Sequence, residues 1–180
     1  MAANNWNIDN SHSTIGFRIR HMVIARVNGT FEDWSGQLTL DPENLTDSSV
    51  EIRINVASVD THEADRDTHL RSADFFDAET YPEIVFTSTS VEAVDAENVR
   101  ILGDLTMHGV TQPVVLAAEY GGRVKDPWGN DRVGFTATTK IDRKDFGLTW
   151  NTALETGGVL VGDTVEITVE LEATAAVAAE

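Results

Sequence analysis

Apolar and polar residues alternate with a period of two along much of this chain. Such alternation is typical of strands with one face against a core and the other in water. It is clearest at Ile15–Ile19, Val50–Val56, Val133–Ile141 and Val165–Leu171. Less regular patterns predict four more strands, at Gly36–Leu40, Ile84–Ser88, Asn98–Thr106 and Val114–Tyr120. Turn-forming pairs rich in glycine, asparagine and proline separate these segments.

One segment interrupts the alternation. Glu63–Phe76 lacks the alternating β-branched residues that are typical of strands. Its acidic residues begin near the start and Arg71 lies further along, a distribution that the helix dipole favours. We therefore expect a short helical insertion there. About eight strands with one brief helix predict an all-β fold, either a sandwich or an antiparallel barrel, of which only the barrel leaves no free edge. A barrel of this size is either filled by side chains or holds one small ligand.

The length of 180 residues suits one domain. We expect the barrel to occupy residues 1–172, because no linker divides the chain. The remaining Ala173–Glu180 is alanine-rich and offers few side chains to a core. It is expected to be a frayed tail.

Thirteen lysines and arginines oppose 30 acidic residues, which gives a net charge of −17. This charge repels phosphate backbones and argues against nucleic acid as a partner. The same charge disfavours electrostatic docking to an anionic membrane surface, so contact with lipid should rest on apolar surface. No run of about 18 uninterrupted apolar residues occurs, so we expect no stable membrane insertion. The first residues lack a basic start and an apolar stretch, and on this basis we expect a cytoplasmic protein.

Catalytic and metal-binding signatures are absent from the sequence. The chain has no cysteine, which excludes disulfides and thiolate chemistry. It also has no Gly-x-Ser-x-Gly, no phosphate-binding loop and no His-Glu-x-x-His. The triplet Asp145-Phe146-Gly147 has no companion kinase motif. We expect Phe146 to pack and Gly147 to end or bend a strand.

The densest polar cluster runs from His62 to Arg71 and allows two interpretations. Its histidines and carboxylates could bind a metal or perform acid–base catalysis. Alternatively, they cap and salt-bridge a helix that covers one end of a barrel. The seven-residue separation of His62 and His69 spans two helical turns, not the single turn common in metal pairs, and favours the second interpretation. We predict no catalytic residue and no metal site.

Many ordered segments of the chain resemble the YceI-like family of polyisoprenoid-binding proteins. The resemblance covers nearly the whole length. It is most specific at Arg66–Asp77 (RDTHLRSADFFD) and continues through Tyr81–Phe86. Further matching segments are Trp6–Asp9, Ser11–Phe17, Arg20–Met22, Gly29–Phe31, Gly103–Thr111, Asp145–Asn151 and Gly162–Ile167.

The resemblance implies an extended, lipocalin-like barrel of eight strands whose apolar pore holds a long isoprenoid chain or the tail of an isoprenoid quinone. It also implies a homodimer in many members, no enzymatic activity and no cofactor. The residues expected to line the pore are Phe17, Ile19, Phe31, Trp34, Phe75, Phe76, Phe86, Leu105, Phe135, Phe146 and Trp150. A polar head could meet Arg20, His21, Arg71 or Arg143, since cations suit phosphates and donors suit a quinone oxygen.

The sequence also allows three other interpretations. The barrel could bind different amphiphiles, such as fatty acids or hydrophobic antibiotics, in a stress response. It could be an enzyme that uses the His62–Arg71 cluster. Finally, its interior could be filled by side chains and bind nothing.

Overall fold

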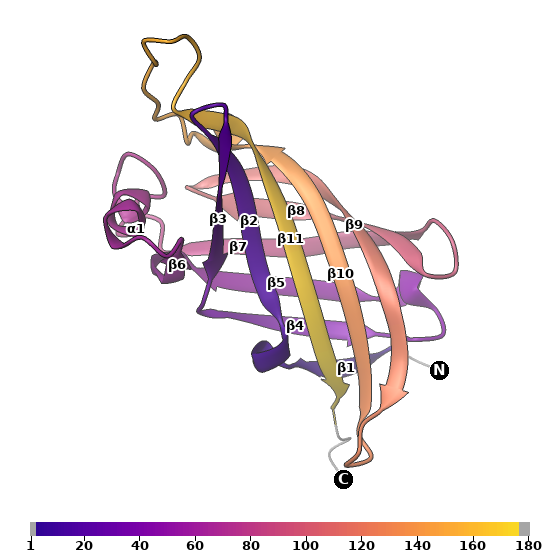
Figure 1. Ribbon diagram of the computed structural model, residues 1–180. Helices are drawn as coiled ribbons and strands as arrows, with labels where there is room; N and C mark the ends of the chain where they lie inside the picture. Colours follow the sequence, from indigo (N-terminus) through magenta and orange to yellow (C-terminus); the bar gives the residue numbers. More distant parts are fainter. Residues whose placement is uncertain (1–2, 177–180) are drawn as a thin grey trace.

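The computed structural model describes residues 3–176, and these form one antiparallel sheet that curls into a barrel (Figure 1). Its strands are β1 (Asn4–Ile8), β2 (Thr14–His21), β3 (Ala25–Phe31), β4 (Trp34–Leu40), β5 (Ser49–Asn55), β6 (Val59–Asp60), β7 (Glu83–Ala93), β8 (Asn98–Met107), β9 (Val110–Lys125), β10 (Asp131–Asp142) and β11 (Val161–Ala175). Short 3-10 helices lie at η1 (Asn10–His12), η2 (Leu45–Asp47), η3 (Val56–Ser58) and η4 (Arg143–Phe146), and the single described α-helix is α1 (Ala64–Arg71).

Eight strands close the barrel. The ring runs β1-β4-β5-β7-β8-β9-β10-β11, and pairing of β11 with β1 joins its two ends. Every neighbouring pair is antiparallel. The predicted eight-stranded antiparallel barrel is therefore confirmed, and the sandwich alternative is excluded.

Strand β11 changes partner along its length. Its last residues pair with β1, whereas Val161–Glu170 pair with β2. The 3-10 helix η1 separates β1 from β2 in the chain, so the two strands pair with different parts of β11. The sheet then continues from β2 to β3 and β6, beyond the closed ring. In Figure 1 this extension lies at the same end of the barrel as α1.

All eight strands that the alternation predicts are present. The sequence pattern did not indicate β1 or β3, because neither alternates cleanly, nor β6, which has only two residues. In β3 the core-facing positions include Gly29, which contributes no apolar side chain. In β1 only Trp6 is buried, and polar asparagines surround it.

The prediction of a frayed tail at Ala173–Glu180 is partly wrong. Strand β11 continues through Ala175, and Ala173 is fully buried opposite Val133 and Ile8. A small residue fits there because the neighbouring cluster already contains the ring of Trp6. The final part of the expected tail, residues 177–180, lies outside the described residues.

The helical insertion is shorter than predicted. Helix α1 covers Ala64–Arg71, and turns follow it as far as residue 80. Its N-cap is Glu63, whose carboxylate accepts hydrogen bonds from the backbone N–H groups of Asp65 and Arg66. These bonds satisfy donors that the first helical turn leaves free.

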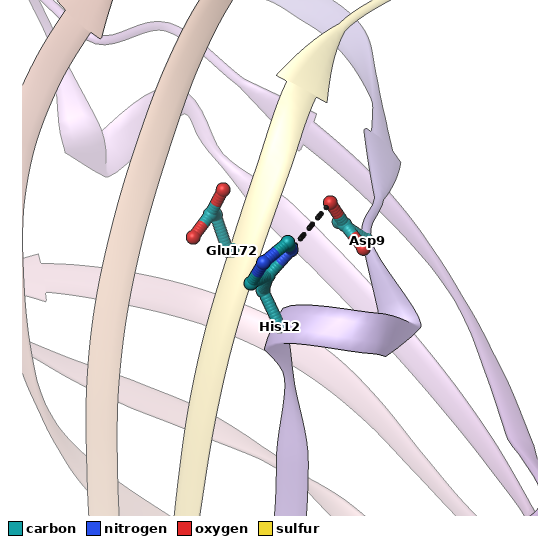
Figure 2. Close-up of side chains that lie close together, drawn as sticks. All are labelled: Asp9, His12 and Glu172. Carbon is teal, nitrogen blue, oxygen red and sulfur yellow. Dashed lines mark hydrogen bonds and ion pairs between the residues drawn. The ribbon is translucent and has the colours of Figure 1, made fainter. Parts of the chain in front are cut away.

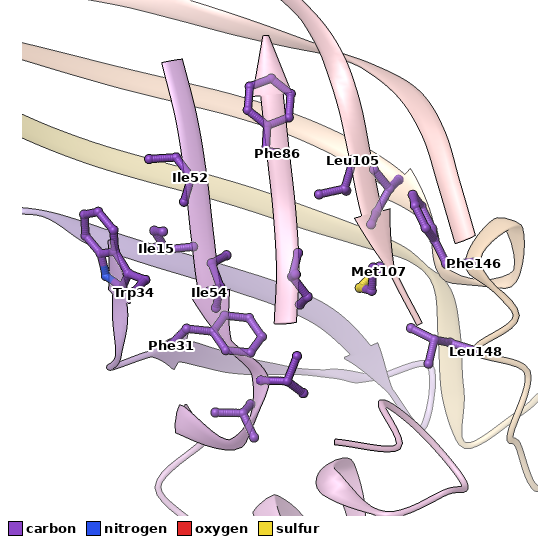
Figure 3. Close-up of a cluster of buried hydrophobic side chains, with 14 residues drawn as sticks. Ile15, Phe31, Trp34, Ile52, Ile54, Phe86, Leu105, Met107, Phe146 and Leu148 are labelled. Carbon is purple, nitrogen blue, oxygen red and sulfur yellow. The ribbon is translucent and has the colours of Figure 1, made fainter. Parts of the chain in front are cut away.

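The main apolar core follows the inner face of the barrel and continues under α1. Figure 3 shows side chains from β2 to β8, from η4 and from the segment after η4 meeting there. A second cluster, around Trp6, Leu40 and Val133, fills the region where β1 closes the ring. The two clusters share Ile8, Val50 and Leu171 as partly buried neighbours.

Candidate functional site

The barrel interior is not filled. It contains a cavity of about 560 Å³, within the range of small-molecule sites. The lining comes from every strand of the ring except β1, together with β2, β3, α1 and the segment after α1. Most of the lining side chains are aliphatic or aromatic. The cavity is therefore an apolar lumen enclosed by a polar outer surface, and the possibility of a filled barrel is excluded.

Most residues expected to line the lumen border it. The structure places nine of them at the cavity wall: Phe17, Ile19, Phe31, Phe75, Phe76, Phe86, Leu105, Phe135 and Trp150. The rings of Phe17 and Phe31 lie 5.6 Å apart, and Phe76 meets Phe31 edge-on at 5.9 Å. These contacts link the β2–β3 wall to the segment after α1 and position an aromatic group at that end of the lumen.

Trp34 and Phe146 are placed elsewhere. Both are almost completely buried in the main core and do not border the cavity (Figure 3). Trp34 follows the turn between β3 and β4, and Phe146 ends η4. Gly147 then ends η4 in the left-handed conformation, so it ends a 3-10 helix and not a strand. The sequence identifies both side chains as apolar but cannot show that helix geometry and a strand break turn them away from the lumen.

Aliphatic residues missing from the expected set supply much of the wall. The side of the lumen formed by β11 includes Val165, Ile167, Val169 and Leu171. These are the apolar positions of one alternating strand, and the period-two pattern already puts them on one face. The expected pore-lining set consists mainly of aromatic residues and omits these four, although their alternation could have identified them.

The ionisable side chains of the lining gather at one end. They are Arg20, His21, Asp65, Arg66, His69 and Arg143, and we call this region the charged end. The lining there has three guanidinium groups and one carboxylate, although the chain as a whole is strongly acidic. The remaining polar side chains of the lining are Ser48, Ser49 and Thr139. A ligand with one polar terminus thus finds cations at one end and apolar walls along most of the remainder.

Arg143 is the most buried cation of the charged end. Its guanidinium donates to the backbone oxygens of Leu148 at 2.7 Å and Gly162 at 2.8 Å. Burial lowers the pKa of Arg143, while the carboxylates of Asp163 and Asp142 act in the opposite direction. The side chain is only 3% exposed, so these carbonyls hold it in a fixed position beside the lumen.

Arg71, the fourth headgroup candidate, does not border the cavity. Its guanidinium donates to the backbone oxygens of Ala57 and Val59 and thereby ties the end of α1 to η3 and β6. The earlier residues of the cluster have similar roles. Buried Asp67 accepts bonds from the N–H and hydroxyl of Thr61, and Arg66 donates to the same threonine. This arrangement favours the helix-seating interpretation of the cluster.

The two histidines of the cluster have different environments. The side chain of His62 is 84% exposed, close to Asp60. His69 borders the cavity, its Nε2 donates to the Asp74 carboxylate at 2.9 Å, and its ring packs edge-on against Trp150 and Phe75. The third ring pair, Phe75 with Trp150, completes an aromatic group at the charged end. His69 therefore belongs to the wall of the lumen, whereas His62 faces solvent.

A separate polar cluster on the outside of the barrel resembles a metal site. Figure 2 shows Asp9, His12 and Glu172, whose possible ligand atoms lie within 4.8 Å of one another. Arg132 already occupies this position. It donates to Asp9 at 3.0 Å, to Asp126 at 2.9 Å and to Glu172. Because a guanidinium neutralises the carboxylates, the cluster is an ion-pair network that fastens η1 to β10 and β11.

The network shifts the pKa values of its members. Hydrogen bonds from Ser11, His12 and Arg132 hold the pKa of Asp9 well below its ordinary value. Desolvation raises the pKa of Asp126, but hydrogen bonds from Asn130 and Arg132 outweigh it and leave that pKa low. The pKa of His12 is raised, first by its hydrogen bond with Asp9.

Among the described residues, no helix has the length and hydropathy needed to cross a bilayer. Fold and cavity together define a class of protein: a closed antiparallel β-barrel that surrounds an apolar lumen with cations at one end. The chain belongs to the YceI-like family, because residues 6–173 match the YceI-like domain.

Three known proteins illustrate the similarity. A UPF0312 protein of Photorhabdus laumondii is 49% identical over 146 residues, which cover 80% of this chain and 76% of that protein. The crystal structure of the Campylobacter jejuni YceI protein is 34% identical, with a TM-score of 0.77 and coverage of 88% and 90% of the two chains. A polyisoprenoid-binding domain from Saccharophagus degradans shares the fold, with a TM-score of 0.71 at 16% identity, over 97% of this chain and 99% of that one.

Proposed function

We propose that this protein binds a long isoprenoid ligand, a polyprenyl chain or an isoprenoid quinone, in the barrel lumen and so carries or sequesters it. The observation that supports this most strongly is the 560 Å³ lumen, with aliphatic and aromatic walls and cations at one end. Such a site removes a hydrocarbon tail from water while its polar terminus stays near solvent.

Burial of the tail supplies enough free energy without a specific hydrogen bond. Each buried methylene is worth about 0.8 kcal/mol, so one five-carbon unit contributes roughly 3–4 kcal/mol. Association costs on the order of 4–15 kcal/mol. A few isoprene units therefore offset that cost. The same reasoning explains how one apolar lumen can accept chains of several lengths.

The charged end suits an anionic or carbonyl headgroup. Arg20 and His21 lie at the end of β2, and Arg143 is held beside them by the backbone of the segment 148–162. Guanidinium groups bind phosphates through charge-assisted hydrogen bonds, and a quinone oxygen accepts from the same donors. The polyisoprenoid-binding domain from Saccharophagus degradans, which has the same fold, adds support for this ligand class.

A binding function fits the polar residues better than catalysis does. The carboxylate and guanidinium groups of Asp67, Arg66 and Arg71 are engaged in holding α1 in place. An enzyme would need an acid or base positioned at a reacting atom. Location in the cytoplasm and assembly as a homodimer stay predictions from the sequence.

Mass analysis of the protein as it leaves the cell tests the ligand class. Protein purified without detergent would be measured by native mass spectrometry and then extracted with organic solvent. The proposal expects a bound species whose mass series is spaced by one isoprene unit. A bound acyl chain would instead establish a fatty-acid or other amphiphile carrier. Absence of any bound molecule, with no uptake of added polyprenol, would refute both.

Two arginine variants test the headgroup assignment. Arg20→Gln removes an exposed cation of the charged end, whereas Arg100→Gln changes a cation of β8 that pairs with Glu92 and does not border the cavity. We expect Arg20→Gln to weaken binding of a polyprenyl diphosphate several-fold and to leave the neutral polyprenol unaffected. Arg100→Gln should match the wild type for both ligands. Equal diphosphate affinity in all three proteins would remove Arg20 from the headgroup site.

A further inference from the structure

The turn between β2 and β3 exposes three consecutive apolar side chains. Met22 is 44% exposed, Val23 55% and Ile24 88%. The hairpin projects from the barrel beside the loop 151–160 (Figure 1). Val159 in that loop is also 43% exposed, and the N–H of Met22 donates to the carbonyl of Leu160 at 2.8 Å. We call Met22, Val23, Ile24 and Val159 the apolar tip.

The backbone of the turn is unfavourable for these residues. Met22 and Val23 have φ angles of +53° and +66°, in the left-handed region. Asparagine and glycine adopt this region easily, but it costs other residues roughly 1–2 kcal/mol each and is worst for β-branched side chains such as valine. The chain therefore carries apolar side chains at a position where local stability favours small polar ones. Such a cost is typical of functional positions.

Cations surround the base of the apolar tip. Arg20 and Arg26 lie directly opposite each other in the β2–β3 ladder, and both are exposed. Like charges in that position repel. Within the described part of the chain, no ion pair joins either guanidinium to a carboxylate. The whole segment from Thr14 to Phe31 contains three arginines and no acid, in a chain with 30 acidic residues.

We propose that the apolar tip docks on the surface of a bilayer that contains anionic phospholipid, with the charged end of the lumen facing the headgroups. Arg20 is two residues from Met22 along the strand, a rise of about 7 Å. Interfacial segments place their apolar side chains roughly 5–10 Å into the headgroup and acyl boundary. Inserted side chains at the tip would thus put the two guanidinium groups at the level of the phosphates.

Local charge makes this compatible with a strongly acidic chain. At physiological ionic strength the Debye length is about 8 Å, so distant carboxylates are screened while Arg20 and Arg26 act directly on the lipid. The tip is also a small convex projection. A stable protein interface needs about 20–30 residues on each side, which four side chains do not provide. A bilayer accepts such a tip without a matching surface.

Vesicle flotation with the full chain tests the docking. Vesicles of phosphatidylcholine alone and of phosphatidylcholine with phosphatidylglycerol contain no isoprenoid, so the result does not depend on the proposed ligand. The wild type is expected to float with the anionic vesicles. The triple variant Met22→Asn, Val23→Gly, Ile24→Ser should bind at least tenfold more weakly. Asn-Gly suits the positive φ angles, so the urea midpoint of this variant should equal or exceed that of the wild type.

Two further variants separate the tip from the remaining surface. Arg26→Gln does not alter the cavity wall and should weaken binding to anionic vesicles about fivefold, by the energy of one surface cation. Trp128→Ser changes an 80% exposed side chain in the β9–β10 turn, at the opposite end of the barrel, and should bind like the wild type (Figure 1).

Several outcomes would overturn the docking proposal. They are a wild type that does not float, a triple variant that floats normally, and loss of binding in Trp128→Ser. If the triple variant floats normally but converts a dimer to a monomer in sedimentation, the tip is a contact between two copies. If the wild type does not bind vesicles but still carries a bound isoprenoid, docking is refuted and the carrier function stands.

Discussion

The ring of Phe17 lies over the α-carbon of Gly29 on the neighbouring strand. The two residues are cross-strand partners, and a β-carbon on Gly29 would lie 2.3 Å from Cζ of Phe17. Phe17 also borders the lumen. The glycine therefore lets the ring lie back against the wall, where a larger residue would push it across the space that a ligand would occupy.

Gly29→Ala should reduce both stability and ligand capacity. The added methyl group forces Phe17 inward or shifts the strand, at a cost of about 1–3 kcal/mol typical of overpacking. Urea unfolding and titration with a polyprenol measure the two effects. The control is Gly134→Ala in β10, where the new β-carbon would meet no atom within 4 Å. That variant should bind normally and unfold at an unchanged or higher midpoint. Equal behaviour of the two variants would contradict this account of Phe17.

The alternation of side chains predicted the strands because it reports which face is buried. In β11, Val165, Ile167 and Val169 all point to the lumen, as the period of two requires. The same signal could not identify β3, since Gly29 has no side chain and its role is visible only once Phe17 lies opposite it. Ring closure is a long-range property, and the pairing of Ala173 with Ile8 has no local signal.

The candidate site could be predicted less completely than the fold. Composition identified Phe17 and Phe86 as apolar, but apolar residues such as Phe146 fill cores as readily as they line cavities. The guanidinium of Arg71 looks equivalent to that of Arg143 in the sequence. Only the structure places Arg71 against the carbonyls of Ala57 and Val59 and Arg143 at the lumen. The direction of a long side chain depends on its neighbours in space, which one sequence does not reveal.

Arg132→Gln should destabilise the barrel and reduce the loss of stability that acid causes. In the wild type the folded-state pKa values of Asp9 and Asp126 lie below the unfolded value of about 3.9. These carboxylates therefore stabilise the fold above pH 4, and that stability is lost as the pH falls below it. Without Arg132 the two pKa values rise toward their ordinary range. Urea midpoints at pH 7, 4 and 3 measure the difference. Arg100→Gln, which breaks an exposed pair with Glu92, should keep the wild-type response.

His12→Asn should change stability in the opposite pH direction. The pKa of His12 is raised in the fold by its hydrogen bond with Asp9. The protonated imidazole therefore stabilises the fold below the unfolded pKa of about 6.5, and this contribution disappears as the pH rises through the folded value. Wild type should lose stability between pH 6 and pH 9 relative to His12→Asn. His62→Asn, at an 84% exposed side chain, should follow the wild type. A parallel response in all three proteins would exclude His12 as the source.

Asp67→Ala should loosen α1 without unfolding the barrel. The carboxylate of Asp67 accepts two hydrogen bonds from Thr61, and its loss should cost about 2–3 kcal/mol locally. Hydrogen exchange across Ala64–Arg71 should then accelerate. Because Asp65, Arg66 and His69 of this helix border the lumen, exchange of a bound polyprenol should accelerate as well. Thr68→Ala removes only a bond within the helix and should change neither rate. Faster hydrogen exchange with unchanged ligand exchange would separate α1 from ligand entry.

Substitution of adjacent residues on β11 tests the lumen most directly. Val169 borders the cavity, whereas Thr168 points to the outside and is exposed. Val169→Phe adds bulk inside the lumen. It should abolish isoprenoid binding or restrict it to much shorter chains, as measured by native mass spectrometry. Thr168→Phe adds a ring on the other face of the same strand and should retain the full ligand. Because the two variants share one strand, a general defect in the β11 pairing would affect both. Loss of ligand in Val169→Phe alone therefore places the ligand inside the barrel, and retention in both would mean that the ligand binds elsewhere.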